Sequence, residues 1–417
     1  MKRNYFVYAC SFFFSLGANI LGLSMVYSLT DRFSFNPGQI GSFVALGQLF
    51  YFLGCNLYQH FGYVLNPAKV FPVAAAIVFI ASIPLGFARS RFLVYAAYWV
   101  IQISTGLYWP PAMSWITEGL GGKALNHEIG IFNRSWMAAS IIGPLIAGSL
   151  YQWNSRVNFL IISLCYLLGV SLLRLMKVYS KRKQAYRHEA ESEHLQEPEQ
   201  AVIASATPAV AAGAAVPQGE KTGTAHVSQL LGGKLNLYRY RGWINAFSSA
   251  MCLGVIANIA PLHIRDVLGY SERTMGTILF SRSVIGFIGF SVLAKFTFWH
   301  FNRRWFFIVQ GCLMFCTLLF LPAGNRLPFY FIIVMLFGFL NSSSYDNSIF
   351  YSGTTGKNPK KNMAIHEIVL AIGHAAGSAG GGLVYQHFRF TGTCLALFMV
   401  LGLNMGVLWL MDKREAR

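Results

Sequence analysis

The chain has 417 residues, of which 55% are hydrophobic and only 12% are charged, and its formal net charge is +18. A soluble domain carries roughly 25% charged residues, so the composition excludes a globular enzyme that is held to a membrane by one hydrophobic segment. Apolar runs long enough to cross a hydrocarbon core, which needs about 20 residues, recur along the whole sequence. The chain is therefore predicted to be an all-α polytopic membrane protein.

Twelve apolar runs between polar breaks are predicted to be membrane-spanning helices. In chain order they cover residues 5–29, 39–58, 68–88, 92–116, 128–151, 157–177, 240–264, 274–297, 305–323, 328–352, 363–386 and 390–411. The polar stretch 178–236 turns from basic to acidic and then becomes rich in Ala, Pro and Gly, which is typical of a disordered linker. We therefore expect two six-helix bundles, 1–177 and 237–417, joined by a cytoplasmic linker.

The 33 Lys and Arg residues are unevenly distributed between the two sides of these spans. Most of them lie in the termini, the linker and alternate loops, as Lys357, Lys360 and Lys361 do. By the positive-inside rule both termini are cytoplasmic, in a membrane that we expect to be a bacterial inner (plasma) membrane. Because topology accounts for the positive charge, we expect no nucleic-acid partner.

The two halves of the chain also repeat each other in sequence. The segment 119–152 aligns without gaps with 353–386, and nearly the same offset aligns further positions in and just before the second and eighth spans. The identical pairs include Gly143/Gly377, Gly148/Gly382, Tyr151/Tyr385, Asp31/Asp266 and Gly41/Gly276. A parallel repeat of six plus six spans is typical of transporters that hold their solute near the midplane, between the halves.

Twelve spans, a central linker and this repeat resemble the major facilitator superfamily. The stretch from Gly54 to Gly62 is similar to the family's loop motif, with Gln59 and His60 where the family has Asp and Arg. The run 143–148 is similar to the ending of a motif associated with antiporters. The resemblance implies a secondary transporter that works by alternating access and is not an enzyme, with the fifth and eighth spans lining the interface between the halves.

Two arginines lie inside these two spans, Arg134 in the fifth and Arg282 in the eighth. A charged residue at mid-membrane costs on the order of 2.5–3.5 kcal/mol, so each must face protein or water. Two cations at the interface predict an anionic solute. The alternative is that each arginine pairs with an acid or caps backbone carbonyls.

Hydrogen-bonding residues are expected to complete the solute site. The tenth span contains the run 341–348, which has no aliphatic residue and so cannot face lipid. Tyr108 and Trp109 would form an aromatic wall opposite it, unless they only pack between helices. Our substrate-binding candidates are Arg134, Arg282, Tyr108, Trp109, Asn341, Ser344, Tyr345, Asn19 and Asn245.

Three ionisable residues are candidates for proton coupling. Glu367 and His374 are spaced two helical turns apart, which places them on one helical face, and Asp346 lies at similar depth in the tenth span. No cluster of acids suited to sodium is present in the sequence. A static contact between helices is the alternative interpretation of this group.

We therefore expect a secondary transporter that moves a small polar, anionic organic solute and is proton-coupled. It should act as a monomer in the lipid bilayer, without cofactor or metal, because neither a phosphate-binding loop nor a metal-ligand cluster occurs in the sequence. The alternatives are a facilitative carrier of a sugar or drug-like solute, a membrane-embedded enzyme, and a sensor that does not transport.

Overall fold

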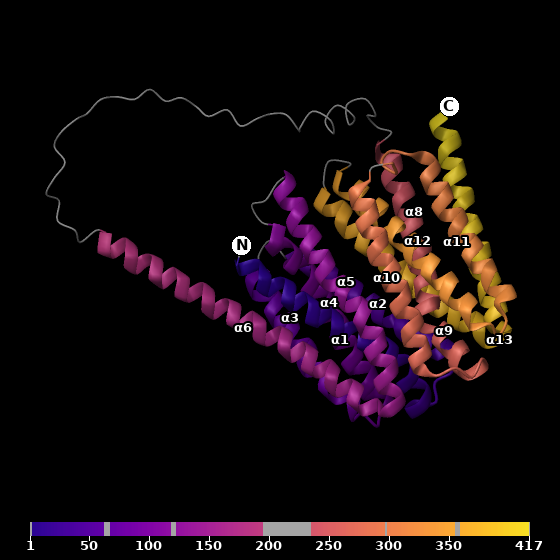
Figure 1. The fold of residues 1–417 in the computed structure, drawn as a ribbon, viewed down its shortest axis with the longest axis horizontal. Coiled ribbons are helices and arrows are strands. Elements are labelled where there is room, and N and C mark those ends of the chain that lie inside the picture. The colour runs from indigo at the N-terminus through magenta and orange to yellow at the C-terminus, as the bar shows by residue number, and fades with distance from the viewer. Residues whose placement is uncertain are drawn as a thin grey trace.

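The computed structural model describes residues 2–61, 67–117, 122–194, 235–296, 298–354 and 359–416. Within these ranges all regular structure is helical (Figure 1). The elements are α1 (Lys2–Phe33), α2 (Pro37–Phe61), α3 (Pro67–Ser82), η1 (Ile83–Gly86), α4 (Arg91–Thr117), α5 (Gly122–Trp153), α6 (Ser155–His194), α8 (Leu235–Asn258), α9 (Ala260–Leu262), η3 (His263–Val267), α10 (Glu272–Lys295), α11 (Arg303–Ala323), α12 (Leu327–Thr354) and α13 (Pro359–Ala416).

The helices are long and apolar, as the sequence predicts. In the described part of the chain, nine helices have the length and hydropathy of a membrane span. One of them is α13, which contains two helices, because Arg389 interrupts it with a backbone φ of 59° and ψ of −168°. The all-α membrane fold is confirmed. The count of twelve stays a prediction, because α4 and α5 are not among the nine.

One predicted boundary falls inside a helix. The linker is predicted to begin at residue 178, whereas α6 continues to His194. Residues 178–194 contain neither Gly nor Pro and are rich in Lys, Arg, Glu, Gln and Ala, all of which favour helix once the apolar span has nucleated it. The rest of the predicted linker, 195–234, lies outside the described residues.

The helices α2 and α10, which follow the first span of each half, begin with side-chain caps. The Asn36 side chain accepts a hydrogen bond from the Gln39 amide at 2.8 Å, and the Gln39 side chain accepts one from the Asn36 amide at 3.0 Å. Ser271 accepts a hydrogen bond from the Thr274 amide at 3.3 Å. These caps satisfy amides that have no partner within the helix, and so they fix where each helix starts.

Both chain termini lie at the same end of the bundles (Figure 1). We call the opposite end, which holds the loops 34–36, 87–90, 268–271 and 324–326, the far end. In each half the fifth helix packs on the first at a repeated glycine. A side chain at Gly143 would overlap Asn19 of α1, and a side chain at Gly377 would overlap Met251 of α8.

The two halves meet along two helix pairs, α2 with α13 and α5 with α10. A β-carbon on Gly41 would overlap the carbonyl oxygen of Ser378, and one on Gly276 would overlap that of Pro144. The two glycines correspond to each other in the sequence repeat, and so do the two residues that supply the carbonyls. The two interfaces are therefore built alike.

The same equivalence holds one turn closer to the far end. Gly382 lies against the carbonyl of Pro37, and Gly148 lies against that of Glu272. Pro37 and Glu272 are the first residues of α2 and α10. These four glycine contacts between the halves therefore lie toward the far end.

Candidate functional site

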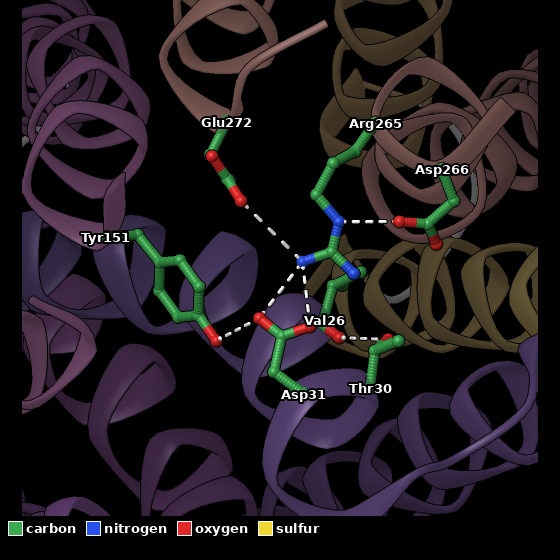
Figure 2. A network of polar contacts seen from close by, with 7 residues as sticks. All are labelled: Val26, Thr30, Asp31, Tyr151, Arg265, Asp266 and Glu272. Carbon is green, nitrogen blue, oxygen red and sulfur yellow. Dashed lines mark hydrogen bonds and ion pairs between the residues drawn. The ribbon is translucent and has the colours of Figure 1, made fainter. Parts of the chain in front are cut away.

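A network of charged side chains joins the halves at the far end (Figure 2). Nη1 of Arg265, in η3, lies 3.0 Å from Oδ1 of Asp31, at the end of α1. The hydroxyl of Tyr151, in the last turn of α5, donates to Asp31 at 2.9 Å. On the C-terminal side, Arg265 pairs with Asp266 at 2.7 Å and lies 3.7 Å from Glu272.

An irregular turn positions Arg265. The α-helical pattern ends at Asn258, Pro261 follows within α9, and His263–Val267 forms a π-helical turn. Such turns are rare and occur frequently at functional sites. This one directs the guanidinium of Arg265 across the interface, where it lies 4.8 Å from the centroid of the buried Tyr27 ring.

The network is suited to opening and closing. The Arg265 side chain is 15% exposed, but those of Asp31 and Asp266 are 42% and 43% exposed. Ion pairs exposed to this extent typically contribute about 1 kcal/mol or less each. The network therefore stabilises contact between the halves without making that contact permanent.

A second contact between the halves lies deeper, at Glu367. The hydroxyl of Tyr51, in α2, donates a hydrogen bond to the Glu367 carboxylate, in α13, at 3.4 Å. Cys55 lies one turn further along α2 than Tyr51, and the ring of Tyr345, in α12, lies edge-on to that of His366, the residue before Glu367. Asp346 follows Tyr345 and is half-buried. Glu367 is thus in contact with the opposite half, and no sequence pattern had pointed to its partner Tyr51.

Arg282, in α10, and His374, in α13, are two further candidate side chains of the C-terminal half. Arg282 is half-buried in α10, and its guanidinium lies 3.3 Å from the Ser283 hydroxyl. No carboxylate in the described ranges pairs with Arg282. Among the same residues, Nδ1 of His374 has no hydrogen-bond partner.

Arg134 is placed differently from Arg282. It is exposed on α5, and its Nε donates to the carbonyl of Gly130 on the preceding turn at 3.1 Å. This is the backbone-capping arrangement that the sequence left open as an alternative. The structure does not bring the two arginines into contact with each other.

In the polar run 341–348 of α12, some side chains form hydrogen bonds and others have no partner in the described part of the chain. Asn341 accepts from Ser249 of α8 at 2.8 Å. Ser344 is fully buried, and its hydroxyl has no partner in the described part of the chain. The Tyr345 ring meets that of His366 edge-on, with centroids 4.9 Å apart. The run therefore retains hydrogen-bonding capacity next to Glu367.

The other sequence candidates lie inside their own halves. Tyr108 is fully buried and stacks on Phe14 at 3.8 Å, with Trp109 edge-on to the same ring. Asn19 donates to Ser140 at 3.2 Å, which ties α1 to α5. Asn245 is also fully buried, and it donates to a backbone carbonyl of α11. These contacts stabilise each bundle.

Among the described residues, no three His, Cys, Asp or Glu side chains are grouped so that they could hold a metal ion. The polar groups described above can bind a solute and exchange protons through hydrogen bonds and charge.

Comparisons with known proteins agree with this architecture. The family model described as Major Facilitator Superfamily matches residues 7–361. A comparison with curated protein sequences gives no significant match.

Solved structures of transporters share the fold. A POT family transporter in complex with a thioalcohol-conjugated peptide aligns with a TM-score of 0.71 and 11% identity, over 99% of this chain and 96% of that chain. A bacterial homologue of the human lysosomal transporter Spinster, inward-facing and occupied, aligns with a TM-score of 0.67 and 11% identity, over 98% and 96%. The nucleoside transporter NupG aligns with a TM-score of 0.66 and 10% identity, over 99% and 100%. At these identities the likeness establishes the fold alone.

Proposed function

Because the chain belongs to the major facilitator superfamily, we propose that it is a secondary transporter that carries a small polar, anionic organic solute by alternating access and couples this movement to protons. The observation that carries the proposal is the distribution of contacts between the halves. Two equivalent glycine interfaces and the Arg265 network join the halves toward the far end. The ion pairs of the Arg265 network are partly exposed, so each contributes about 1 kcal/mol or less and can break at low cost.

The far end is the external end in this proposal, because the Lys and Arg distribution favours cytoplasmic termini. Closure at the far end then corresponds to an inward-facing transporter. Opening outward requires the Asp31–Arg265 pair to break and the halves to rock about their interfaces. Residues 1–177 and 237–417 are the two units that would move.

Arg282 supports an anionic solute. It is a half-buried cation without a carboxylate partner among the described residues, and the same half holds His374, whose Nδ1 has no hydrogen-bond partner among them. A carboxylate or phosphate on the solute would supply the missing charge through charge-assisted hydrogen bonds. Asn341, Ser344 and Tyr345 of α12 would bind the solute's other polar groups. Arg134 would then contribute at the mouth of the site.

Glu367 is the proposed coupling group. Its hydrogen bond with Tyr51 joins α13 to α2, so the bond exists only while these two helices are close together. Since a carboxyl group's proton affinity depends on its hydrogen bonds and its access to water, that affinity differs between the two states of the transporter. His374 and Asp346 would pass the proton along the same interface.

The test begins with a thermal-shift screen of the purified protein against organic carboxylates, phosphate esters and neutral sugars. Uptake of the solute so identified is then measured in proteoliposomes with and without an imposed pH gradient. Wild type should concentrate the solute only with the gradient. Glu367→Gln should lose this accumulation but keep solute counterflow, and the control Glu415→Gln should behave as wild type.

Two outcomes would overturn parts of the proposal. Accumulation by Glu367→Gln would show that Glu367 is not the coupling group. Equilibration of a neutral sugar, unaffected by the gradient, would indicate a facilitative carrier.

A further inference from the structure

A basic pocket lies at the far end of the N-terminal half, apart from the interface described above. Its volume is about 370 Å³, and it is lined by Arg32, Arg89 and Arg156 together with Phe33 and Phe87. These residues come from the end of α1, the segment after η1 and the start of α6. No carboxylate is among the residues that line the pocket. Three positive charges therefore share one small cavity.

Arg32 forms the fixed part of the pocket. Its guanidinium donates to the carbonyl oxygens of Leu85 at 3.0 Å and Ala88 at 2.5 Å, and it lies 5.8 Å from the centroid of the Phe159 ring. These bonds hold the 3₁₀ turn of η1 against α1, so the charge cannot move away. Arg89 and Arg156 are exposed, and their side chains are free to turn toward a ligand.

The charges in the pocket predict the chemistry of the ligand. Like charges repel, so three positive charges in one cavity favour an anionic ligand. Arg89 and Arg156 can each offer paired N–H donors to that anion, and Arg32 adds its fixed charge. A phosphate group presents several acceptor oxygens and one or two negative charges, which matches guanidinium groups that converge from different sides.

The surroundings of the pocket place it at the depth of lipid headgroups. Apolar side chains such as Ile80 of α3 and Leu160 of α6 are exposed on the adjacent helices, as expected of a surface that faces lipid. Phe87 is 63% exposed and Trp153 is 78% exposed at the far end. Large aromatic residues gather at the boundary between hydrocarbon and water.

We infer that this pocket binds the phosphate group of an anionic ligand, which is either a lipid headgroup in the adjacent leaflet or a free phosphate. The inference does not depend on the transported solute, because no residue of the pocket belongs to the interface between the halves.

The test uses the purified, delipidated full-length chain in a neutral detergent. Its melting temperature is measured with phosphatidylglycerol or with phosphatidylcholine of the same acyl chains. It is also measured with inorganic phosphate or with chloride at equal ionic strength. Native mass spectrometry counts the bound lipids. The double variant Arg89→Gln/Arg156→Gln is compared with the control Arg326→Glu, which changes the net charge by the same amount at an exposed far-end position of the other half.

Binding should raise the melting temperature of wild type and of Arg326→Glu by about 2–4 °C, and the double variant should lose most of this shift. The apparent affinity should fall at least about tenfold, because two charge-assisted contacts are lost. A shift with phosphatidylglycerol alone identifies a lipid headgroup, and a shift with inorganic phosphate identifies a free anion. No shift in wild type, an equal shift in the double variant, or an equal loss in Arg326→Glu would overturn the inference.

Discussion

Arg282 in α10 and Gly47 in α2 occupy equivalent positions in the two halves, at the same offset as the pair Gly41/Gly276. In the N-terminal half this position is closed, because a β-carbon on Gly47 would overlap the Tyr98 ring. In the C-terminal half it holds a half-buried guanidinium that no described carboxylate pairs with. At this position the N-terminal half is therefore tightly packed, whereas the C-terminal half carries a positive charge.

The proposed coupling residues differ between the halves in the same way. Glu367 corresponds to Asn133, whose side chain accepts a hydrogen bond from Trp136 on its own helix at 3.1 Å. His374 corresponds to Ser140, which accepts a hydrogen bond from Asn19. The N-terminal residues bond within their own half, whereas Glu367 bonds to the opposite half and Nδ1 of His374 has no described partner.

The residues that pack the halves together are repeated, whereas those proposed to bind the solute and the proton differ between the halves. The glycines that set the distance between the halves are repeated, so both interfaces can rock in the same way. The ionisable groups proposed for binding and coupling, Arg282, Glu367 and His374, are not repeated, so the C-terminal half is expected to supply most of the charge that binds the solute and the proton.

Substitutions at the two equivalent glycine interfaces are expected to have the largest effect. Gly41→Ala and Gly276→Ala should each reduce uptake about tenfold or more, because the added carbon overlaps a backbone carbonyl of the opposite half and such overpacking costs about 1–3 kcal/mol. Uptake of the identified solute into proteoliposomes is the measurement. If the interfaces are equivalent, the two losses should be similar.

Matched controls are Gly22→Ala in α1 and Gly380→Ala in α13, where nothing lies within 4 Å of the added carbon. Both should transport as wild type does. A large loss in only one of the interface variants would break the symmetry argument.

Substitution of Arg282, which has no charged counterpart in the N-terminal half, is expected to have the next largest effect. Arg282→Gln should raise the apparent KM for an anionic solute about tenfold or more, since a partly desolvated charge-assisted contact is worth about 1.5–3 kcal/mol. Arg134→Gln should change it less than about threefold, because Arg134 is exposed and already bonded to Gly130. Equal effects of the two substitutions would refute the placement of the anion near Arg282.

The far-end network predicts the smallest effect. Asp31→Asn and Arg265→Gln should each change the uptake rate by about two- to fivefold, because exposed ion pairs contribute about 1 kcal/mol or less. Their effects should not be additive in the double variant, since both remove the same pair. High salt should shrink the effects, because it screens charges at the surface. Fully additive, salt-independent effects would show that the pair does not act as a gate.

Much of the scaffold could be predicted from the sequence. Long apolar runs predicted the spanning helices, and the repeated pairs Gly41/Gly276 and Gly143/Gly377 fall at equivalent close approaches in the structure. Glycine at such a position is required by steric contact alone. Such a requirement can be recognised from a repeat within a single sequence. The end of α6 was missed, because the stretch after the apolar span is polar and yet still helical.

The site was less predictable, because helical spacing shows on which face of a helix a residue lies but not which residues that face contacts. Tyr108 shares a face with other aromatic residues, and the structure buries it within its own half. Arg265 follows the predicted seventh span, 240–264, and so is expected in a loop, although the repeated Asp31 and Asp266 indicate that this end is important. Tyr51 had no signal, since its partner Glu367 lies in the other half of the sequence.

The most direct test of alternating access measures distances at both ends of the protein by double electron–electron resonance. Spin labels on introduced p-acetylphenylalanine leave the seven native cysteines in place. One pair at Ser34 and Asn325 reports on the far end, and another pair at Gln59 and Arg304 reports on the termini end. In proteoliposomes, with and without the solute and a pH gradient, each pair should show two distances whose populations shift in opposite directions. A single unchanging distance at both ends, in a protein that still transports, would contradict the account.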